Sequence, residues 1–211
     1  MILLEGFFQL FTDPVQLIQY GGIILLLAII YMETGFFLGF IIPGGDYLIF
    51  TAGLLSVTNF LNVPLLVLVP AMIVAAILGD FTGYLQGRWL GKKLYDKPDS
   101  KLFKRSYLQK SRAFYDKYGM WAFVTGRFLP VIRTMIPMLA GASGISFRRF
   151  SYLNIIGAVL WIGTLAPLGY FLGDAYPQLI HYSIYFLIGF MVVASSSMLR
   201  IIKPFQKKKK H

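Results

Sequence analysis

The 211-residue sequence contains no cysteine, which excludes disulfides, iron–sulfur clusters and thiolate metal sites. Histidine is scarce too, because only His181 and His211 occur, and neither has a suitable nucleophile or acid partner. The sequence also lacks a Gly-x-Ser-x-Gly motif, a phosphate-binding loop, a metal-ligand cluster and the histidine arrangement of a membrane lipid phosphatase. We therefore expect no enzyme activity, no catalytic residue, no metal and no cofactor.

Basic residues are absent from the first 87 positions, and all 20 lie at Arg88 or beyond. Nine of them fall in the segment 92–118, and six more lie between Arg200 and the C-terminus. A net charge of +11 would suggest nucleic acid as the partner of a soluble protein. Here the distribution fits membrane orientation instead, because lysine and arginine accumulate in cytoplasmic loops. The segment 92–118, the pair at 148–149 and the basic tail 204–211 are predicted to be cytoplasmic, without a nucleic-acid partner.

Long apolar runs dominate what remains, and 57% of all residues are hydrophobic. The stretches 64–87, 150–172 and 178–198 each have the roughly 20 residues that a helix needs to cross a bilayer. The last of them belongs to a final transmembrane helix at 178–203. The sequence thus predicts an all-α polytopic membrane protein with about three full transmembrane helices. Residues 1–211 form a single membrane domain that spans the membrane several times.

Two other apolar regions are interrupted by charge and by helix-breaking residues. These are Glu33 and Asp46 around Pro43 and Gly44, and Arg127 and Arg133 around Pro130. Charge in hydrocarbon is unfavourable and usually functional, and broken segments in corresponding halves of a membrane protein indicate a transport site. Asp46 has a second interpretation as the N-cap of the following helix. Asp80 either positions the arginines or lies in the inner interface.

The charge map also predicts how the two halves are oriented. The chain between 118 and 148 must enter and leave on the cytoplasmic side, which predicts a re-entrant helical hairpin at about 119–146. The hairpin at about 21–58 must enter from outside, since the span at 64–87 starts there. The halves, 1–91 and 119–173, are therefore inverted repeats whose facing hairpins enclose a cavity near the midplane.

Two segments have the character of interfacial helices. Residues 101–118 form a basic amphipathic stretch on the inner surface, which is either a connector or a segment that recruits lipid substrate. Residues 3–20 are its expected counterpart on the outer face. Within the first long span, glycines recur every four residues, a spacing that lets a neighbouring helix approach closely. They are Gly79, Gly83, Gly87 and Gly91.

The charged residue types suggest distinct roles. Arginine binds phosphate in a bidentate manner and keeps its charge at working pH, so Arg127 and Arg133 could converge on one anionic group. Burial favours the protonated form of a carboxylate, which makes Glu33 the better proton carrier of the two acids. A structural alternative remains, in which Glu33 and Asp46 simply form ion pairs with the two arginines.

Three motifs in residues 30–170 resemble the DedA family, also described as SNARE-associated or VTT-domain membrane proteins. They are Glu33 with Phe40-Ile41-Ile42-Pro43-Gly44-Gly45-Asp46, Gly79-Asp80-Phe81-Thr82-Gly83-Tyr84 with Gly87-Arg88, and Gly126-Arg127-Phe128-Leu129-Pro130-Val131-Ile132-Arg133 with Pro137 and Ala140-Gly141. One departure is Gly45, which lengthens the usual Pro-Gly-acid spacing by one residue. The resemblance implies facing re-entrant hairpins and a lipid-translocating activity.

In bacteria the resemblance further implies a flippase that returns undecaprenyl phosphate, the cell-wall carrier lipid, across the cytoplasmic membrane. Glu33, Asp46, Arg127 and Arg133 would be its functional set, and the expected mechanism is proton-coupled alternating access around a phosphate site. The implied partners are the phospholipid bilayer, undecaprenyl phosphate or a related anionic lipid, and protons, while a homo-oligomer is an assembly that the sequence leaves open. Two other functions also stay open: a proton-coupled exporter of small cations or drugs, and a nonselective lipid scramblase.

Overall fold

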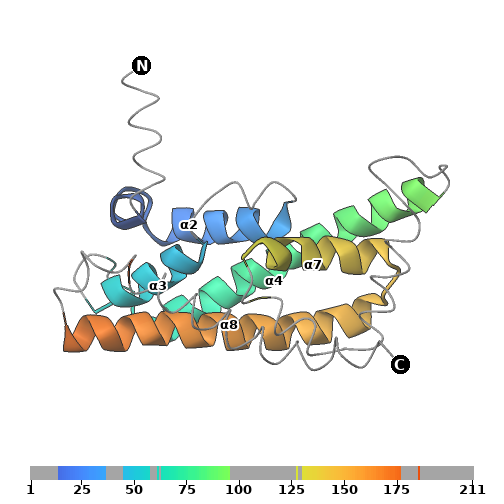
Figure 1. Ribbon diagram of the computed structural model, residues 1–211. Coiled ribbons are helices and arrows are strands. Elements are labelled where there is room, and N and C mark those ends of the chain that lie inside the picture. The colour runs from blue at the N-terminus through green and yellow to red at the C-terminus, as the bar shows by residue number, and fades with distance from the viewer. Residues whose placement is uncertain are drawn as a thin grey trace, which may run out of the picture.

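The computed structural model describes residues 14–36, 45–57, 61, 63–95, 127, 130–176 and 185. The regular structure in these residues is entirely helical, which confirms the predicted all-α class (Figure 1). Five helices make up this part of the chain: α2 (Pro14–Gly35), α3 (Gly45–Leu55), α4 (Leu65–Tyr95), α7 (Pro130–Ala142) and α8 (Phe147–Ala175).

Two helices are long and apolar enough to cross a membrane. They comprise Leu65–Gly91 within α4, with 27 residues, and the whole of α8, with 29 residues. At about 1.5 Å per residue, each exceeds the thickness of the hydrocarbon core. Two of the three predicted spans are thus present as continuous helices. The third, at 178–203, lies outside the described residues apart from Tyr185. The predicted cytoplasmic segment 92–118 is described only as far as Tyr95, and the tail 204–211 also lies outside the described residues.

The helices before α4 are too short to span. Helix α3 has 11 residues, and α2 is divided at Gly22, whose φ of 56° and ψ of −156° are not helical. Glycine adopts such a positive φ without steric penalty. Figure 1 shows the first turns of α2 end-on and the remainder lengthwise, so the chain changes direction at this point. The later part of α2 and α3 occupy the two arms of the hairpin predicted at 21–58, whose re-entrance stays a prediction.

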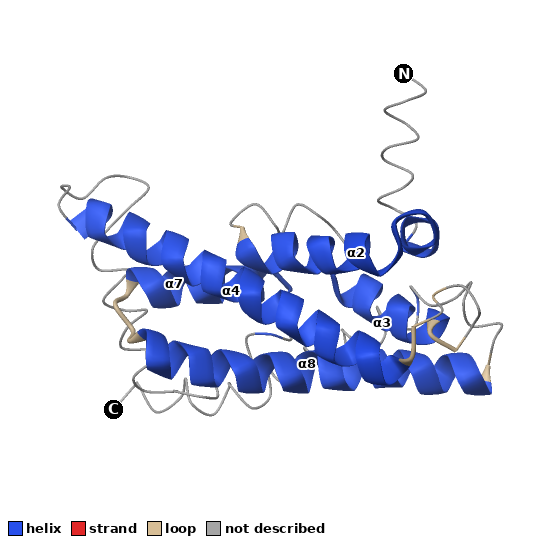
Figure 2. Cartoon of the chain, turned by 180° about the vertical axis from the view of Figure 1, so that it is seen from behind, coloured by secondary structure: helices blue, strands red, loops and turns tan. Residues whose placement is uncertain are grey.

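The most extensive helix contacts join the two halves of the chain. Helix α3 packs on α8, and α7 packs on α4, so each short helix lies against the long helix of the other half (Figures 1 and 2). Glycine permits this approach in both pairs. A Cβ on Gly53 would overlap the carbonyl oxygen of Ala166, and a Cβ on Gly141 would overlap that of Tyr84.

The glycine series along α4 has the packing role that its spacing predicts. A Cβ on Gly79 would overlap Thr34 of α2, and one on Gly87 would overlap the backbone of α7 at Met138. At Gly91 an added Cβ would lie 2.7 Å from the Cα of Ala142. Helix α4 therefore presents one small-residue face to α2 and α7, which positions both helices beside the charged residues described next.

Candidate functional site

The charged residues that the sequence singled out are deeply buried. Among the described residues, the carboxylate and guanidinium side chains exposed by 8% or less are Glu33, Asp46, Asp80, Arg127 and Arg133. The three acids lie on different helices, Glu33 on α2, Asp46 on α3 and Asp80 on α4. Arg133 lies on α7, and Arg127 lies three residues before the start of α7. Burial of so many charges is tolerable only when they compensate one another. The structure brings them together in two clusters.

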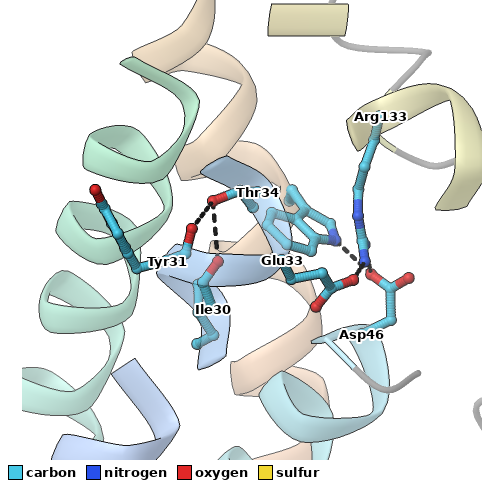
Figure 3. A network of polar contacts seen from close by, with 7 residues as sticks. Ile30, Tyr31, Glu33, Thr34, Asp46 and Arg133 are labelled. Atoms are coloured by element: carbon cyan, nitrogen blue, oxygen red, sulfur yellow. Dashed lines mark hydrogen bonds and ion pairs between the residues drawn. The ribbon is translucent and has the colours of Figure 1, made fainter. Parts of the chain in front are cut away.

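The first cluster is centred on Arg133 of α7. Its Nη1 donates to Oδ1 of Asp46 and its Nη2 donates to Oε1 of Glu33, so one guanidinium binds carboxylates from two other helices (Figure 3). Figure 3 shows the Arg133 side chain reaching down to the two acids where α2 and α3 approach each other. Arg133 therefore links α2, α3 and α7 at one point. We call Arg133, Glu33 and Asp46 the Arg133 cluster.

Asp46 is not the N-cap that one interpretation of the sequence proposed. Helix α3 begins one residue earlier, at Gly45, and Asp46 lies inside its first turn. Its carboxylate is instead turned to Arg133, because a buried guanidinium requires a charged partner more strongly than the helix end requires a cap. Gly45 contributes in another way, since an added Cβ there would overlap the Glu33 carboxylate. Gly45, which lengthens the Pro-Gly-acid spacing by one residue, thus leaves space for the Glu33 side chain.

The second cluster is centred on Arg127. Its Nη2 donates to Oδ2 of Asp80 on α4 and to Oδ1 of Asn154 on α8. Of the two interpretations of Asp80, this contact agrees with the one in which Asp80 positions an arginine. Gly157, one turn beyond Asn154, provides space for the side chain, since a Cβ there would lie 2.7 Å from Nε of Arg127. We call Arg127, Asp80 and Asn154 the Arg127 cluster.

Trp161 of α8 contacts residues of both clusters. Its ring centroid is 4.5 Å from Cζ of Arg133 and 5.7 Å from Cζ of Arg127. Both distances fall within the range of a cation–π interaction. The indole Nε1 also donates to Oδ1 of Asp46 at 2.7 Å. The two arginines thus converge on one aromatic ring, whereas each binds different carboxylates.

This arrangement differs from the simple structural cluster that the sequence allowed. In that alternative, Glu33 and Asp46 pair with both arginines, but the structure places both acids on Arg133 and gives Asp80 to Arg127. Three carboxylates face two guanidinium groups, so one negative charge is in excess when all are ionised.

Sequence reasoning missed Asn154, Gly157 and Trp161. A signal for two of them was present, since an amide inside a span usually bonds a neighbouring helix and tryptophan usually lies at the membrane interface rather than mid-span. Pro43 and Gly44 lie outside the described residues, and Pro130 begins α7. In the described part of the chain, no three His, Cys, Asp or Glu residues gather where they could hold a metal ion.

Comparison with known proteins identifies the family. Residues 21–171 match the sequence model of the VTT domain. The chain belongs to the VTT-domain family, which includes the DedA proteins. It is 43% identical over 151 residues to protein DedA of Escherichia coli K12, covering 71% of this chain and 68% of that protein. No solved structure matches this chain.

Two further relatives are named as membrane proteins. The chain is 39% identical over 170 residues to uncharacterized membrane protein ML0287 of Mycobacterium leprae, covering 81% of this chain and 70% of the relative. It is 33% identical over 147 residues to inner membrane protein YghB of Escherichia coli K12, covering 69% and 65%. This chain is therefore a membrane protein of a family associated with membrane transport.

Proposed function

We propose that this protein is a flippase for an anionic polyprenyl phosphate, specifically undecaprenyl phosphate, and that it uses protons to return this carrier lipid across the bacterial cytoplasmic membrane. The observation that carries the proposal is a pair of buried arginines that face one tryptophan ring and are held by three carboxylates. The basic segment 92–118 and the C-terminus are placed in the cytoplasm by the positive-inside rule.

The Arg133 cluster suggests how a phosphate enters. A carboxylate and a phosphate both bind guanidinium through two parallel hydrogen bonds, so a lipid headgroup competes with Glu33 and Asp46 for Arg133. A proton on Glu33 removes its charge and weakens its bond to Arg133. The freed guanidinium then binds the phosphate, and loss of the proton later returns Arg133 to its carboxylate. Each exchange replaces one anion with another, which keeps the buried arginine compensated.

The Arg127 cluster has a steadier role in this mechanism. Arg127 is bound by one carboxylate and one neutral amide, so its charge is matched without an excess acid. It supplies a second positive centre beside Trp161 while Arg133 changes partner. Because the residues of each cluster come from both halves of the chain, relative movement of the halves would open the site to either side in turn. The prenyl tail stays in the surrounding lipid.

The test is uptake of undecaprenyl phosphate from one leaflet of liposomes that contain the purified protein, with and without a pH gradient. Arg133→Lys should abolish uptake, because an ammonium group cannot reproduce the bidentate fork. Glu33→Gln should leave uptake that no longer responds to the gradient. Arg88→Lys, at an exposed arginine outside both clusters, is the matched control and should behave as the wild type. Equal uptake in all four proteins would contradict the proposal.

A second candidate is a proton-coupled exporter of small cations, which the excess negative charge of the site favours. In that case the acids bind the substrate, and Arg133→Lys would retain much of the activity because only its charge matters. Absence of any lipid movement, together with cation efflux driven by a pH gradient, would establish the exporter. Movement of several unrelated headgroups without response to pH would instead indicate a nonselective scramblase.

A further inference from the structure

Asn154 of α8 has a buried amide whose two ends are in different situations. The residue is 1% exposed, and its Oδ1 accepts a hydrogen bond from Nη2 of Arg127. Asp80 lies beside the amide, but Oδ2 of Asp80 is bound by Arg127, and Nδ2 of Asn154 makes no hydrogen bond in the described structure. Since a buried donor without an acceptor destabilises the folded protein, this free end requires an explanation.

The amide lies on the face of α8 that meets both arginines. Gly157 and Trp161 follow Asn154 after three and seven residues, a spacing that puts all three on one side of a helix. The Arg127 side chain lies against Gly157, and Cζ of Arg127 and of Arg133 are 5.7 and 4.5 Å from the ring centroid of Trp161. An anion that binds between the two guanidinium groups is therefore next to the amide that holds Arg127.

The two guanidinium groups alone do not distinguish a phosphate from a carboxylate. Both anions accept bidentate hydrogen bonds from arginine, and the resting partners of Arg127 and Arg133 are carboxylates. A fatty acid in the bilayer would thus compete with a phosphate lipid for the same arginines. A phosphate differs because it has three strong acceptor oxygens, whereas a carboxylate has two. Two oxygens bind the fork of one guanidinium, and the third needs another donor.

We propose that Asn154 is a substrate-binding residue whose Nδ2–H donates to this third oxygen and so selects a phosphate over a carboxylate. Oδ1 continues to hold Arg127 while Nδ2 binds the ligand. The amide does not titrate, so the selection is independent of the proton assigned to Glu33. This inference rests on the proposed function, since it concerns the headgroup that enters the same site.

The test compares two ligands of equal chain length, a short-chain prenyl phosphate and the corresponding prenyl carboxylate. Calorimetric titration of the purified full-length protein in detergent gives the Kd of each ligand at a pH at which both are ionised. The wild type should bind the phosphate more tightly. Asn154→Leu has a similar volume without either polar end. It should lower the preference, measured as the ratio of the two Kd values, by about tenfold, the factor expected for one hydrogen bond to a charged group.

This ratio separates selection by the amide from a purely structural role. If Asn154 only holds Arg127, Asn154→Leu should weaken both ligands alike and leave the ratio unchanged, which would overturn the proposal. Asn154→Asp keeps an oxygen for Arg127 and removes the donor, so it too should lose the preference, and it replaces the leucine variant if that protein does not fold. A wild-type ratio in Asn154→Asp would also overturn the proposal. Gln86→Leu, at a partly buried amide of α4 outside both clusters, is the matched control.

Failure of this inference and failure of the proposed function give different results. If wild-type liposomes take up undecaprenyl phosphate and both Asn154 variants keep the wild-type ratio, the amide has no selective role and the flippase stands. If the wild type shows no uptake but prefers the phosphate through Asn154, transport is refuted and the binding role is retained. A wild type that binds the phosphate no more tightly than the carboxylate would refute the inference whatever the uptake.

Discussion

The two halves of this protein share a mode of packing and differ in charge. In each half a short helix packs on the long helix of the other, and Gly53 and Gly141 provide the close approach in the corresponding contacts. The buried charges follow no such correspondence. The first half supplies Glu33, Asp46 and Asp80, all acidic, and the second supplies Arg127 and Arg133.

This difference gives the charged residues a role that a packing contact alone cannot have. Each of the three ion pairs within the two clusters joins an acid of the first half to an arginine of the second. Neither half can compensate its own buried charges, so the site exists only when the halves are assembled. A headgroup or proton that changes these pairs acts directly on the contact between halves. Stability should therefore fall most when an ion pair between the halves is broken, less when the packing between them is disturbed, and least when a contact within one half is lost.

The largest loss is expected when an arginine is left without its carboxylate. Asp80→Ala removes the acid that binds Arg127, and breaking a buried ion pair in this way destabilises a protein by about 3–5 kcal/mol. The measurement is the free energy of unfolding of the purified protein in detergent. Asp174→Ala, at an exposed acid at the end of α8, is the control and should change little.

A double-mutant cycle then shows whether the loss comes from the pair itself. Asp80→Asn and Arg127→Gln together should cost less than the sum of the two single changes, because the double variant buries no uncompensated charge. Additive losses would mean that the two residues act independently, and the ion pair between halves would then have no energetic role.

A smaller loss is expected when the shared packing is disturbed. Gly53→Ala and Gly141→Ala each place a Cβ where a backbone carbonyl of the other half already lies. Such overpacking typically destabilises by about 1–3 kcal/mol. If the halves use the same packing, the two variants should lose similar amounts in the same unfolding assay. Gly163→Ala is the control, since its Cβ would meet nothing within 4 Å. A large loss in only one of the two variants would show that the contacts are not equivalent.

The smallest loss is expected for a polar contact within one half. Tyr31 of α2 and Thr82 of α4 share a hydrogen bond of 2.9 Å that is only partly buried. Tyr31→Phe removes it and should lower the free energy of unfolding by about 1 kcal/mol. Transport and its pH dependence should stay at wild-type levels. A loss as large as that of Asp80→Ala would contradict the ranking, because it would place a contact within one half among the main supports of the fold.

Much of the framework was predictable from hydrophobic periodicity and residue spacing. The spans in α4 and α8, the packing face of α4 and the burial of the charged residues all follow from patterns that a local stretch of sequence contains. The partners of those charges do not. Which acid meets Arg127 depends on the rotation of α4 against α8, and that rotation is decided by contacts between distant residues such as Asp80 and Asn154.

Asp46 illustrates the same limit. Its position after Pro43-Gly44-Gly45 is typical of a helix N-cap, and a local pattern cannot show that a buried arginine lies nearby. Trp161 is unusual in the middle of a span, but its contacts with the two arginines depend on how distant helices pack. The overall orientation in the membrane and the re-entrance of the two hairpins stay predictions from the charge distribution.

The most direct test of the central claim is to count the protons taken up when a phosphate displaces a carboxylate from Arg133. Calorimetric titration with a short-chain prenyl phosphate, in two buffers of different ionisation enthalpy, measures this number. We expect net proton uptake on binding in the wild type and less of it in Glu33→Gln. Binding with the same proton count in both proteins would show that Glu33 takes up no proton when its ion pair with Arg133 breaks. That result would contradict the proposed mechanism.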